Sequence, residues 1–524
     1  MLTFPAITQF GSHFYGDEGD GIQNLWNIWH MRQSIEQHRW PYFAPEIHFP
    51  EGTTLLGHTL SPTNALAGAA LESFLTPFQS YDLLVIFAFV ASGLSAFLLA
   101  YYFCRSYWPS IIAGFIYAFS GYQMLHIGSH INLNSLEWLP LFLLFWHKML
   151  TRPKIHLGLI AALFLTLTFY TELYYFLYAA IAALLFLIVV AARAGIADFF
   201  NRKRLKALAA FLAAIILTTC PFIIAFIAAN HADPFQDNHN PLQFSIELLG
   251  PMMPGFLKAW YGQRLTIGEG VGESFLGITV LGLMVFAVFR RRDLRQRFLD
   301  GWLLVFGVFL LLSFGPYLHV GNVNTGIPMP YNLLQKVVPL LSVAAMPNRM
   351  VIMAVLAAAM IVALALAEIS RQIASPRWSA LIIAVLALLI FVEYLPAQAF
   401  HPTQPQPAAY AQALKKLPGS GAVFDDYYSS RSLYLMLFYE QMTYDRPVYG
   451  GYISRRPLSV IQKDAILYSE YSSGRYDALC GSGFRYIVTH GKVIAGATPV
   501  FNDGYTRIYD LSTFDNYCRA RLGS

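Results

Sequence analysis

Ten apolar runs dominate the sequence and constrain what it can fold into. Hydrophobic residues make up 56% of the 524 residues and charged residues only 12%, whereas soluble domains carry about 25% charged residues. A helix needs about 20 apolar residues to cross a bilayer, and the longer runs reach that length. We therefore expect a multi-pass α-helical membrane protein with about ten visible spans. The runs cover residues 79–104, 109–125, 136–150, 156–171, 173–193, 206–229, 274–290, 301–315, 350–369 and 378–398.

Basic residues mark alternate connections between these runs. Five connections hold sixteen Lys and Arg residues, whereas the opposite segments before the C-terminal region hold six. Basic loops stay in the cytoplasm, so we expect the other side to be extracytoplasmic. The net charge of +5 is then an orientation signal and not a groove for nucleic acid. The segments predicted outside are the opening loop 11–78, the loops 230–272 and 316–348, and everything after about residue 399.

The apolar segment before the acidic loop is shorter than a membrane span. The opening MLTFPAITQF is apolar but too short to cross a bilayer. Because an acidic loop needs a preceding segment to carry it across, we expect that a first helix has been clipped before Met1. The alternative is a chain that begins outside after a short interfacial stretch.

Three parts follow from this pattern. Residues 1–398 form the predicted polytopic membrane domain, and the proline-rich residues 399–410 form a linker. Residues 411–524 have short helix and strand patterns that predict a small extracytoplasmic α/β domain. Within the loop 11–78, the spacing of tryptophan and aliphatic residues predicts an amphipathic helix over 20–38 that lies in the membrane interface.

Two of the four cysteines fall in the predicted external part. Cys480 and Cys518 are there candidates for a disulfide, because disulfides persist in oxidising compartments. Cys104 and Cys220 fall in predicted spans and are expected to be small apolar packing residues.

The most unusual stretch is GDEGDG, which places Asp17, Glu18 and Asp20 in one short loop. A carboxylate at the membrane surface can act as a general base toward an acceptor hydroxyl. Two carboxylates together, here Asp17 and Asp20, could instead hold a divalent cation, and no other cofactor is indicated. A third interpretation is structural, with Asp20 as the N-cap of the following helix. The residues alone leave all three open.

The order of motifs resembles the GT-C superfamily of integral-membrane glycosyltransferases. The resemblance is to its polyprenyl-phosphate-sugar-dependent branch and to bacterial membrane proteins of the YfhO-like and family-39-like kinds. The stretches that carry it span most of the chain, and they are GDEGDGIQNLWNIWH, FPEGTTLLGHTLSPTN, HINLNSLEWLPLFLL, FGPYLHV with IPMPYNLL and MPNR, and RPVYGGYISRRP. A missing first span would depart from this family.

The resemblance implies roles for the acidic loop. GT-C enzymes use an Asp, or an Asp-Glu pair, in the first external loop as the catalytic base or acceptor-binding carboxylate. Asp17 matches the first position, Glu18 the second, and Asp20 fits the spacing of the bacterial relatives.

Other side chains are candidates for substrate binding. Arg349 stands at the external start of a span, where a charge is costly unless it is used, and could stabilise a departing lipid phosphate. The alternative for Arg349 is an interfacial arginine that extends its charge toward water, and each remaining candidate could instead be an interfacial residue whose polar group is satisfied. The remaining candidates are His58 in the first loop, His126 and His130 at helical spacing, Glu172 in an external turn, and Arg264 and Glu273 in the loop 230–272.

We therefore expect a membrane glycosyltransferase that moves a hexosyl or pentosyl unit, with inversion, from a polyprenyl-phosphate donor to an acceptor. Its partners would be that donor, membrane lipids and a glycan, lipid or protein acceptor, at the outer face of a bacterial cytoplasmic membrane. The alternative is a flippase or transporter of lipid-linked glycans, or a non-catalytic membrane scaffold. Transporters tend to bury charges at mid-membrane and to contain inverted repeats, and neither is visible in the sequence.

Overall fold

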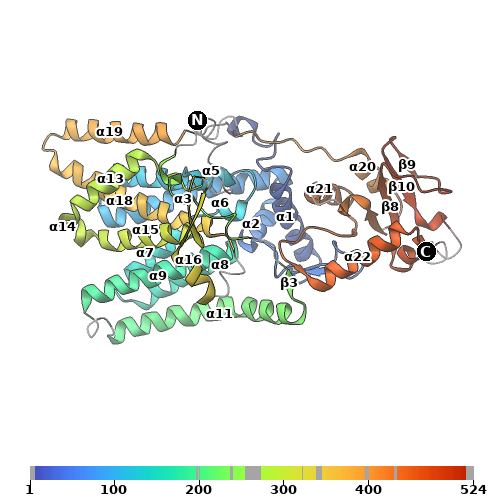
Figure 1. Ribbon diagram of the computed structural model, residues 1–524, viewed down its shortest axis with the longest axis horizontal. Coiled ribbons are helices and arrows are strands. Elements are labelled where there is room, and N and C mark those ends of the chain that lie inside the picture. The colour runs from blue at the N-terminus through green and yellow to red at the C-terminus, as the bar shows by residue number, and fades with distance from the viewer. Residues whose placement is uncertain are drawn as a thin grey trace.

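The computed structural model has a bundle of helices at one end and a mixed helix-and-sheet region at the other (Figure 1). The first loop lies between these two parts. The residues that it describes are 6–195, 199, 201–236, 240–253, 273–321, 323–337, 345–395, 400–419, 421–429, 434–514 and 518.

Each predicted apolar run falls on a helix. Among the described helices, five are long and apolar enough to cross a membrane, and a sixth counts if residues 291–297 and α15, which meet at 94°, form one broken span. The number of spans therefore stays a prediction. The helices that match the ten runs are α3 (Pro77–Cys104), α4 (Tyr107–Ala118), α7 (Trp138–Thr151), α8 (Ile155–Thr171), α9 (Leu173–Ala194), α11 (Arg202–Ala232), α13 (Ile278–Phe289), α15 (Leu299–Ser313), α18 (Val351–Gln372) and α19 (Pro376–Glu393).

Helix α18 is the centre of the bundle. Its side chains from Val351 to Leu366 are all buried, and α3, α4, α13 and α15 pack around it. Many of these residues are alanines, and small side chains let helix backbones approach closely where no water drives association. At the edges, α11 and α19 expose Leu217, Ile224 and Leu388. These two helices present the apolar outer surface that a lipid environment requires.

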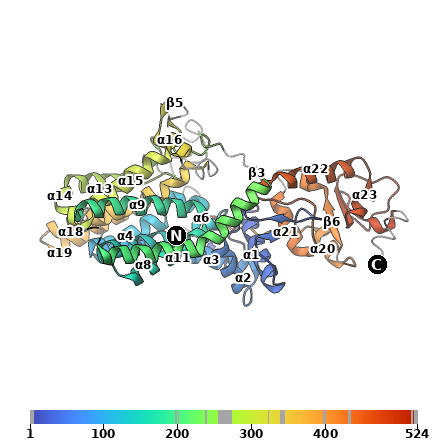
Figure 2. The same ribbon diagram turned by 90° about the horizontal axis from the view of Figure 1, so that it is seen from below.

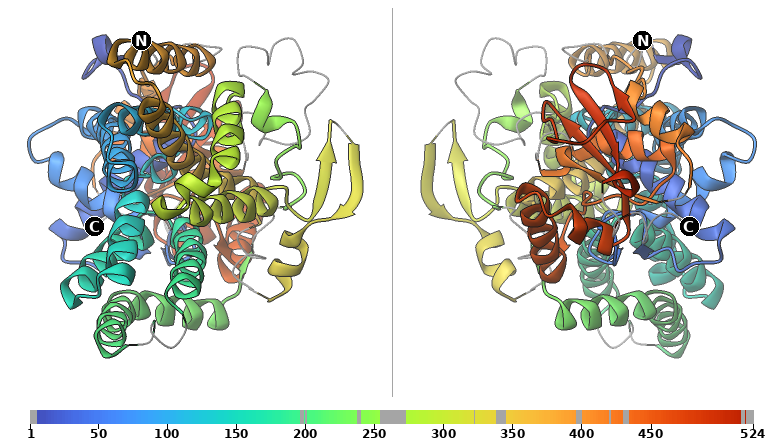
Figure 3. Two further views of the ribbon diagram at one scale, coloured as in Figure 1. Left: turned by 90° about the vertical axis from the view of Figure 1, so that its left-hand side faces the viewer. Right: turned by 90° about the vertical axis from the view of Figure 1, so that its right-hand side faces the viewer.

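The ends of the bundle differ in composition. The arginine-rich helix α14 (Arg291–Leu294) and the turn between α18 and α19 lie at the end away from the C-terminal residues (Figure 1). The first loop lies at the other end. A hairpin of β4 (Tyr317–Val320) and β5 (Val323–Pro328), followed by α16 (Pro330–Val337), projects sideways from the body (Figures 2 and 3).

The first loop contains the predicted helix, but its environment corrects our expectation. Helix α1 (Asp20–Glu36) buries Ile22, Leu25, Trp26 and Trp29 against protein. The Trp26 ring stacks on Phe438, with ring centroids 4.7 Å apart. An apolar face that is covered by protein cannot lie in the membrane interface, so the interfacial role predicted for residues 20–38 is wrong. Helix α2 (Pro62–Leu71) packs beside α1.

The C-terminal residues contain a four-stranded sheet in the order β6-β8-β10-β9. Strands β6 (Ala422–Asp425) and β8 (Phe484–His490) are parallel, whereas β10 (Thr506–Asp510) is antiparallel to β8 and to β9 (Phe501–Asn502). The remaining elements of this region are the helices α20 (Ala409–Lys416), α21 (Tyr434–Tyr444), α22 (Leu458–Ser472) and α23 (Tyr476–Gly481) and the short strand β7 (Arg456–Pro457).

The C-terminal residues are fastened to the rest of the chain at several points. Strand β7 pairs with β3 (Phe235–Gln236) just after α11. In the segment predicted as a linker, Thr403 and Phe14 exchange two backbone hydrogen bonds of 2.8 and 2.9 Å. The indole N–H of Trp26 donates to Gln441 Oε1 at 2.9 Å. The described part of the predicted linker is therefore packed against the first loop.

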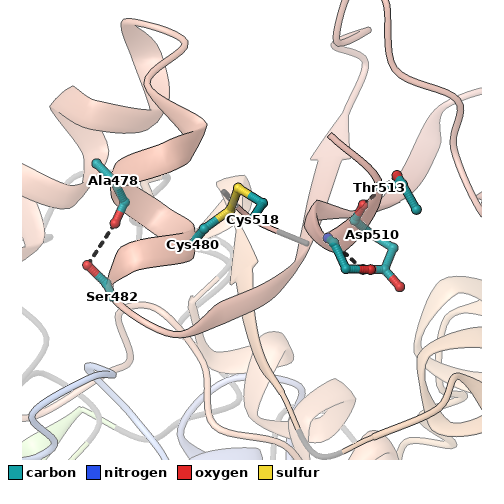
Figure 4. Close-up of a disulfide and its surroundings, with 7 residues drawn as sticks. Ala478, Cys480, Ser482, Asp510, Thr513 and Cys518 are labelled. Carbon is teal, nitrogen blue, oxygen red and sulfur yellow. Dashed lines mark hydrogen bonds between the residues drawn. A yellow bond between two sulfur atoms is a disulfide. The ribbon is translucent and has the colours of Figure 1, made fainter. Parts of the chain in front are cut away.

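A disulfide joins Cys480 in α23 to Cys518, with the two Cα atoms 5.4 Å apart (Figure 4). The two cysteines are 38 residues apart in sequence, and both are buried. The bond therefore ties the C-terminal end of the chain to the helix that precedes β8.

We predict that Cys480→Ser lowers the free energy of unfolding of the C-terminal region by about 2–4 kcal/mol, because the open chain gains conformational entropy when the loop is no longer closed. Thermal unfolding of the purified protein with and without reductant measures this effect. The control is Cys220→Ser, which removes a thiol that forms no disulfide. Two free thiols at 480 and 518 in the intact mass of the non-reduced protein would contradict the bond.

Candidate functional site

The acidic loop docks on the turn that joins α5 (Gly121–His126) to α6 (Ile131–Asn134). The backbone N–H of Asp17 donates to the carbonyl oxygen of Gly128 at 2.6 Å. Glycine is required at Gly21, because a Cβ there would lie 2.8 Å from the same carbonyl oxygen. The two segments, about a hundred residues apart in sequence, thus form one surface.

Asp17 shapes the start of α1. Its Oδ1 accepts hydrogen bonds from the backbone N–H groups of Gly19, at 3.0 Å, and Gly21, at 2.7 Å. The helix begins at Asp20 with Gly19 as its N-cap residue. A carboxylate of the loop therefore does cap the helix, as the structural interpretation predicted. The capping residue is Asp17 and not Asp20, because Asp17 satisfies the free N–H groups at the start of the helix.

Asp20 faces the histidine pair instead. Its Oδ2 lies 3.3 Å from His130 Nε2, and the rings of His126 and His130 are 5.5 Å apart at nearly right angles. His126 donates from Nδ1 to the carbonyl oxygen of Tyr122 at 2.7 Å. The two histidines are neighbours, as predicted, but α5 ends at His126 and His130 belongs to the following turn.

On the side away from Asp20, the histidine pair contacts residues that lie far along the chain. His126 Nε2 is 3.6 Å from Glu273 Oε1, and Asn348 donates from Nδ2 to Glu273 Oε2 at 2.7 Å. Asn348 and Arg349 belong to the short turn at the start of α18. Glu273 and Arg349, predicted separately, are therefore brought to the site by neighbouring segments.

Arg349, Glu172 and Tyr174 form the cationic side of the site. The guanidinium carbon of Arg349 lies 5.2 Å from the centroid of the Tyr174 ring, and the carboxylate of Glu172 interacts with it electrostatically. Glu172 is the N-cap of α9 and accepts from the backbone N–H of Tyr174 at 3.3 Å. Its other oxygen accepts from Asn132, which lies two residues after His130. Asn132 thereby connects the acidic and the cationic sides.

A pocket adjoins the cationic side and encloses about 770 Å³ of non-protein space, part of it open to solvent. His58, predicted from the sequence, lines this pocket and contacts Asn27 Oδ1 at 3.0 Å. The pocket is also lined by Glu172, Tyr174 and Arg455, by polar residues of the first loop, and by the aromatic side chains Tyr42, Phe169, Tyr170, Phe222 and Phe226.

Burial sets the charge state of several of these groups. It raises the pKa of Asp17 above its usual value of 3.8, against the lowering effect of the hydrogen bonds from the two glycines. Burial lowers the pKa of His58 to about 3 and that of His126 to about 4, and it lowers the pKa of His130 well below 6.5. All three histidines are therefore neutral near pH 7.

Some predicted residues lie apart from this arrangement. Glu18 is exposed, and Arg264 lies outside the described residues. Across the part of the chain that the structure describes, Asp17 and Asp20 belong to no group of three close metal-ligating side chains. Such a group is formed instead by Asp425, Asp426 and His490, at the carboxyl ends of β6 and β8.

The sequence reasoning missed Asn132, Asn348 and Arg455 as site residues. Asn132 and Arg455 both lie in stretches that carry the family resemblance, HINLNSLEWLPLFLL and RPVYGGYISRRP, and Asn348 precedes the predicted Arg349. A polar side chain within a matching motif was the signal that could have found them.

A comparison with known protein families places the chain in one of them. Residues 6–393 match the family described as "Domain of unknown function (DUF6311)", so the chain belongs to that family. No curated protein matches it.

Solved structures of membrane glycosyltransferases share the fold. ArnT from Cupriavidus metallidurans in the apo state is 11% identical with a TM-score of 0.53, over 99% of this chain and 97% of that chain. ArnT bound to undecaprenyl phosphate is 12% identical with the same TM-score, over 96% and 95%. The arabinofuranosyltransferase AftD from Mycobacteria is 13% identical with a TM-score of 0.53, over 98% of this chain and 41% of that chain. The chain thus has the GT-C fold.

An archaeal oligosaccharyltransferase is more distant. The chain is 13% identical to AglB from Archaeoglobus fulgidus, with a TM-score of 0.43, and covers 66% of that protein.

We predict that Glu172→Ala destabilises the protein by about 1–3 kcal/mol, because the buried amide of Asn132 loses its acceptor. Glu172→Gln keeps one acceptor oxygen and should lose less. Thermal unfolding in detergent measures both variants, with Glu18→Ala, at an exposed position, as the control. An equal Tm for Glu172→Ala and wild type would show that the contact contributes nothing.

Proposed function

We propose that this protein is a glycosyltransferase that transfers a sugar from a polyprenyl-phosphate donor to an acceptor hydroxyl at the extracytoplasmic face of a bacterial membrane. The observation that carries the proposal is the contact between the acidic first loop and the histidine pair, with Arg349 on the other side of that pair, on the GT-C fold. The acids and the arginine come from segments that are more than three hundred residues apart, yet Asp20 contacts His130 and the charge of Arg349 acts on the same histidine pair.

The acidic side would act on the acceptor. A carboxylate accepts the proton of the attacking hydroxyl more readily when its pKa is raised toward the working pH, and burial raises the pKa of Asp17. Asp20, held next to His130, would orient the acceptor. Attack by an activated hydroxyl on the face opposite the phosphate gives inversion at the sugar carbon.

The cationic side would act on the leaving group. As the bond between sugar and phosphate breaks, negative charge grows on the phosphate oxygens, and a fixed cation lowers the energy of that transition state. Arg349 is held in place by the Tyr174 ring and presents a planar fork that suits phosphate oxygens. A divalent cation held by Asp17 and Asp20 would also stabilise the negative charge on the phosphate oxygens. The transfer assay should therefore be run with and without added divalent cation.

The first test replaces Asp17 by Asn. The amide oxygen still accepts from Gly19 and Gly21, so the loop should keep its shape, whereas proton acceptance is lost. We expect transfer to fall by about 10²–10⁴-fold, measured in membranes with a panel of polyprenyl-phosphate sugars. The loss of transfer activity in Asp20→Asn and in Glu18→Gln, compared with that in Asp17→Asn, shows how much each of the three carboxylates contributes. Glu51→Gln is the control, since Glu51 is an exposed acid of the same loop that pairs with Lys463. Full activity of the Asp17 variant would refute its assignment as the base.

The second test is the pH profile of transfer. A base works in its deprotonated form, so activity should be present above the raised pKa of Asp17 and lost as the pH falls through it. The acid limb should therefore lie above pH 3.8, the usual value for Asp. In Asp17→Asn this limb should disappear from the residual activity. A limb that is unchanged in the variant would belong to another group.

A further inference from the structure

We propose that Asp425, Asp426 and His490 form a binding site for a divalent transition-metal ion in the C-terminal part of the chain. Asp425 is the last residue of β6, Asp426 follows it directly, and His490 is the last residue of β8. One ligand atom from each of the three side chains lies within 4.8 Å of the other two. The proposal goes beyond the proposed sugar transfer and is independent of it, because all three ligands come from the C-terminal residues.

The sheet holds the three residues at one edge. Strands β6 and β8 are parallel neighbours in the sheet order, so their carboxyl ends lie side by side. The backbone N–H of His490 donates to Asp426 Oδ1 at 3.1 Å, which fastens the residue after β6 to the end of β8. Open α/β sheets bind ligands beyond the carboxyl ends of their strands, and these three side chains stand at that position.

Two of the proposed ligand atoms are close enough for one ion to bridge them. His490 Nε2 lies 3.1 Å from Asp425 Oδ1. Two ligand atoms on a tetrahedral zinc ion, each bonded at about 2.0–2.2 Å, are about 3.4 Å apart, so the pair needs to open only slightly. The side chains of Asp425 and His490 are 0% and 2% exposed, which limits competition from water.

Two tyrosine hydroxyl groups orient the carboxylates. Tyr410 donates to Asp425 Oδ2 at 3.2 Å, and Tyr471 donates to Asp426 Oδ2 at 2.9 Å. Outer hydrogen bonds of this kind fix the direction of metal-binding carboxylates and are a regular part of protein metal sites. The two aspartates are therefore held in place by residues outside the proposed ligand set.

The imidazole of His490 is positioned to bind a metal through Nε2. Its Nδ1 lies 3.2 Å from Thr506 Oγ1, and when Nδ1 carries the proton and donates to this oxygen, Nε2 keeps its lone pair. The ring stacks on Tyr427, with the centroids 3.4 Å and the planes 5° apart. A metal binds imidazole in the plane of the ring, so the stacked tyrosine fixes the ring without covering Nε2. The metal-free alternative is a hydrogen bond in which Nε2–H donates to Asp425.

The surroundings of the cluster are charged as well. Asp425 and Asp426 are adjacent, and like charges held at short distance repel each other. Glu440 interacts electrostatically with Asp425 and adds a third acid. Lys492, whose ammonium group lies 4.1 Å from the centroid of the Tyr471 ring, offsets part of this negative charge. A divalent ion bound between the two aspartates relieves their repulsion at the shortest distance.

The ligand types indicate the class of ion. Imidazole nitrogen suits zinc and other transition metals, whereas Mg²⁺ and Ca²⁺ prefer sites made of oxygen ligands. Three protein ligands leave one position of a tetrahedral ion for water or for an oxygen atom of a bound molecule. We therefore expect Zn²⁺ to bind more tightly than Mn²⁺, and both to bind more tightly than Mg²⁺ or Ca²⁺.

Metal binding by the full-length protein in detergent tests the proposal. The protein is stripped with a chelator and titrated with Zn²⁺, followed by calorimetry and by the rise in Tm that an ion bound only to the folded state produces. Asp426→Asn keeps one oxygen for the backbone N–H of His490, so it should fold but bind Zn²⁺ about 10-fold or more weakly. Asp477→Asn, at an exposed acid of the same region, is the matched control and should bind as wild type.

Two further variants separate the ligands from their support. His490→Gln removes the nitrogen ligand and should abolish the preference for Zn²⁺ over Mg²⁺. Tyr471→Phe removes only the outer hydrogen bond to Asp426 and should weaken Zn²⁺ binding less than Asp426→Asn does. The Tm of each stripped variant, measured alongside, shows whether the fold is kept.

The outcomes that overturn the proposal are distinct. If folded wild-type protein gains no Tm with Zn²⁺, or if Asp426→Asn gains as much, the cluster is a metal-free pair of Asp425 and His490. Equal affinity of wild type for Zn²⁺ and Mg²⁺ would contradict the assignment to a transition metal. Asp17→Asn should bind Zn²⁺ as wild type does; loss of binding in that variant would place the ion at the acidic loop instead.

Discussion

The docking of the first loop between the helical bundle and the C-terminal residues is the constraint on which the site depends. The loop has little regular structure apart from α1 and α2, and a loop of that kind needs partners for its backbone groups. It finds them on both sides, at Gly128 on the bundle and at Thr403 in the C-terminal part. Trp26 adds a buried stacking contact and a hydrogen bond to α21. The acids near the bundle surface are positioned because the whole loop is held.

The helical part of this fold could be predicted from the sequence because lipid imposes one rule on every span. Backbone groups in a bilayer must be satisfied within the helix, so a long apolar run leaves few alternatives, and each run does contain a helix. The environment of α1 could not be predicted in the same way. A stripe with Trp26 and Trp29 shows that the face is covered, but lipid and protein both cover such a face. The covering helix, α21, is about four hundred residues away in sequence.

In the candidate site too, the sequence indicated individual residues but not the contacts between distant segments. The sequence identified Asp17 from its acidic loop, His130 from its spacing to His126, Glu172 from an external turn, and Arg349 from its position at the start of a predicted span. It could not say that Asp17 caps α1, since that depends on a backbone geometry set by the contact between Gly21 and Gly128. It also could not connect Asn132 to Glu172, or Arg455 to Tyr174. These contacts form only when separate helices pack side by side, and no spacing within a motif encodes them.

The separation of charges within the site explains how acids and arginines can serve one reaction. An arginine in direct contact with Asp17 would hold the carboxylate in its ionised form and lower its pKa, which would make it a weaker base. The described contacts keep the two apart: Asp20 meets His130, whereas Arg349 meets Tyr174. The neutral imidazole of His130 contacts Asp20, and Asn132 donates to Glu172 on the side of Arg349. The carboxylates can then remain basic toward a hydroxyl while the guanidinium group keeps its charge for a phosphate.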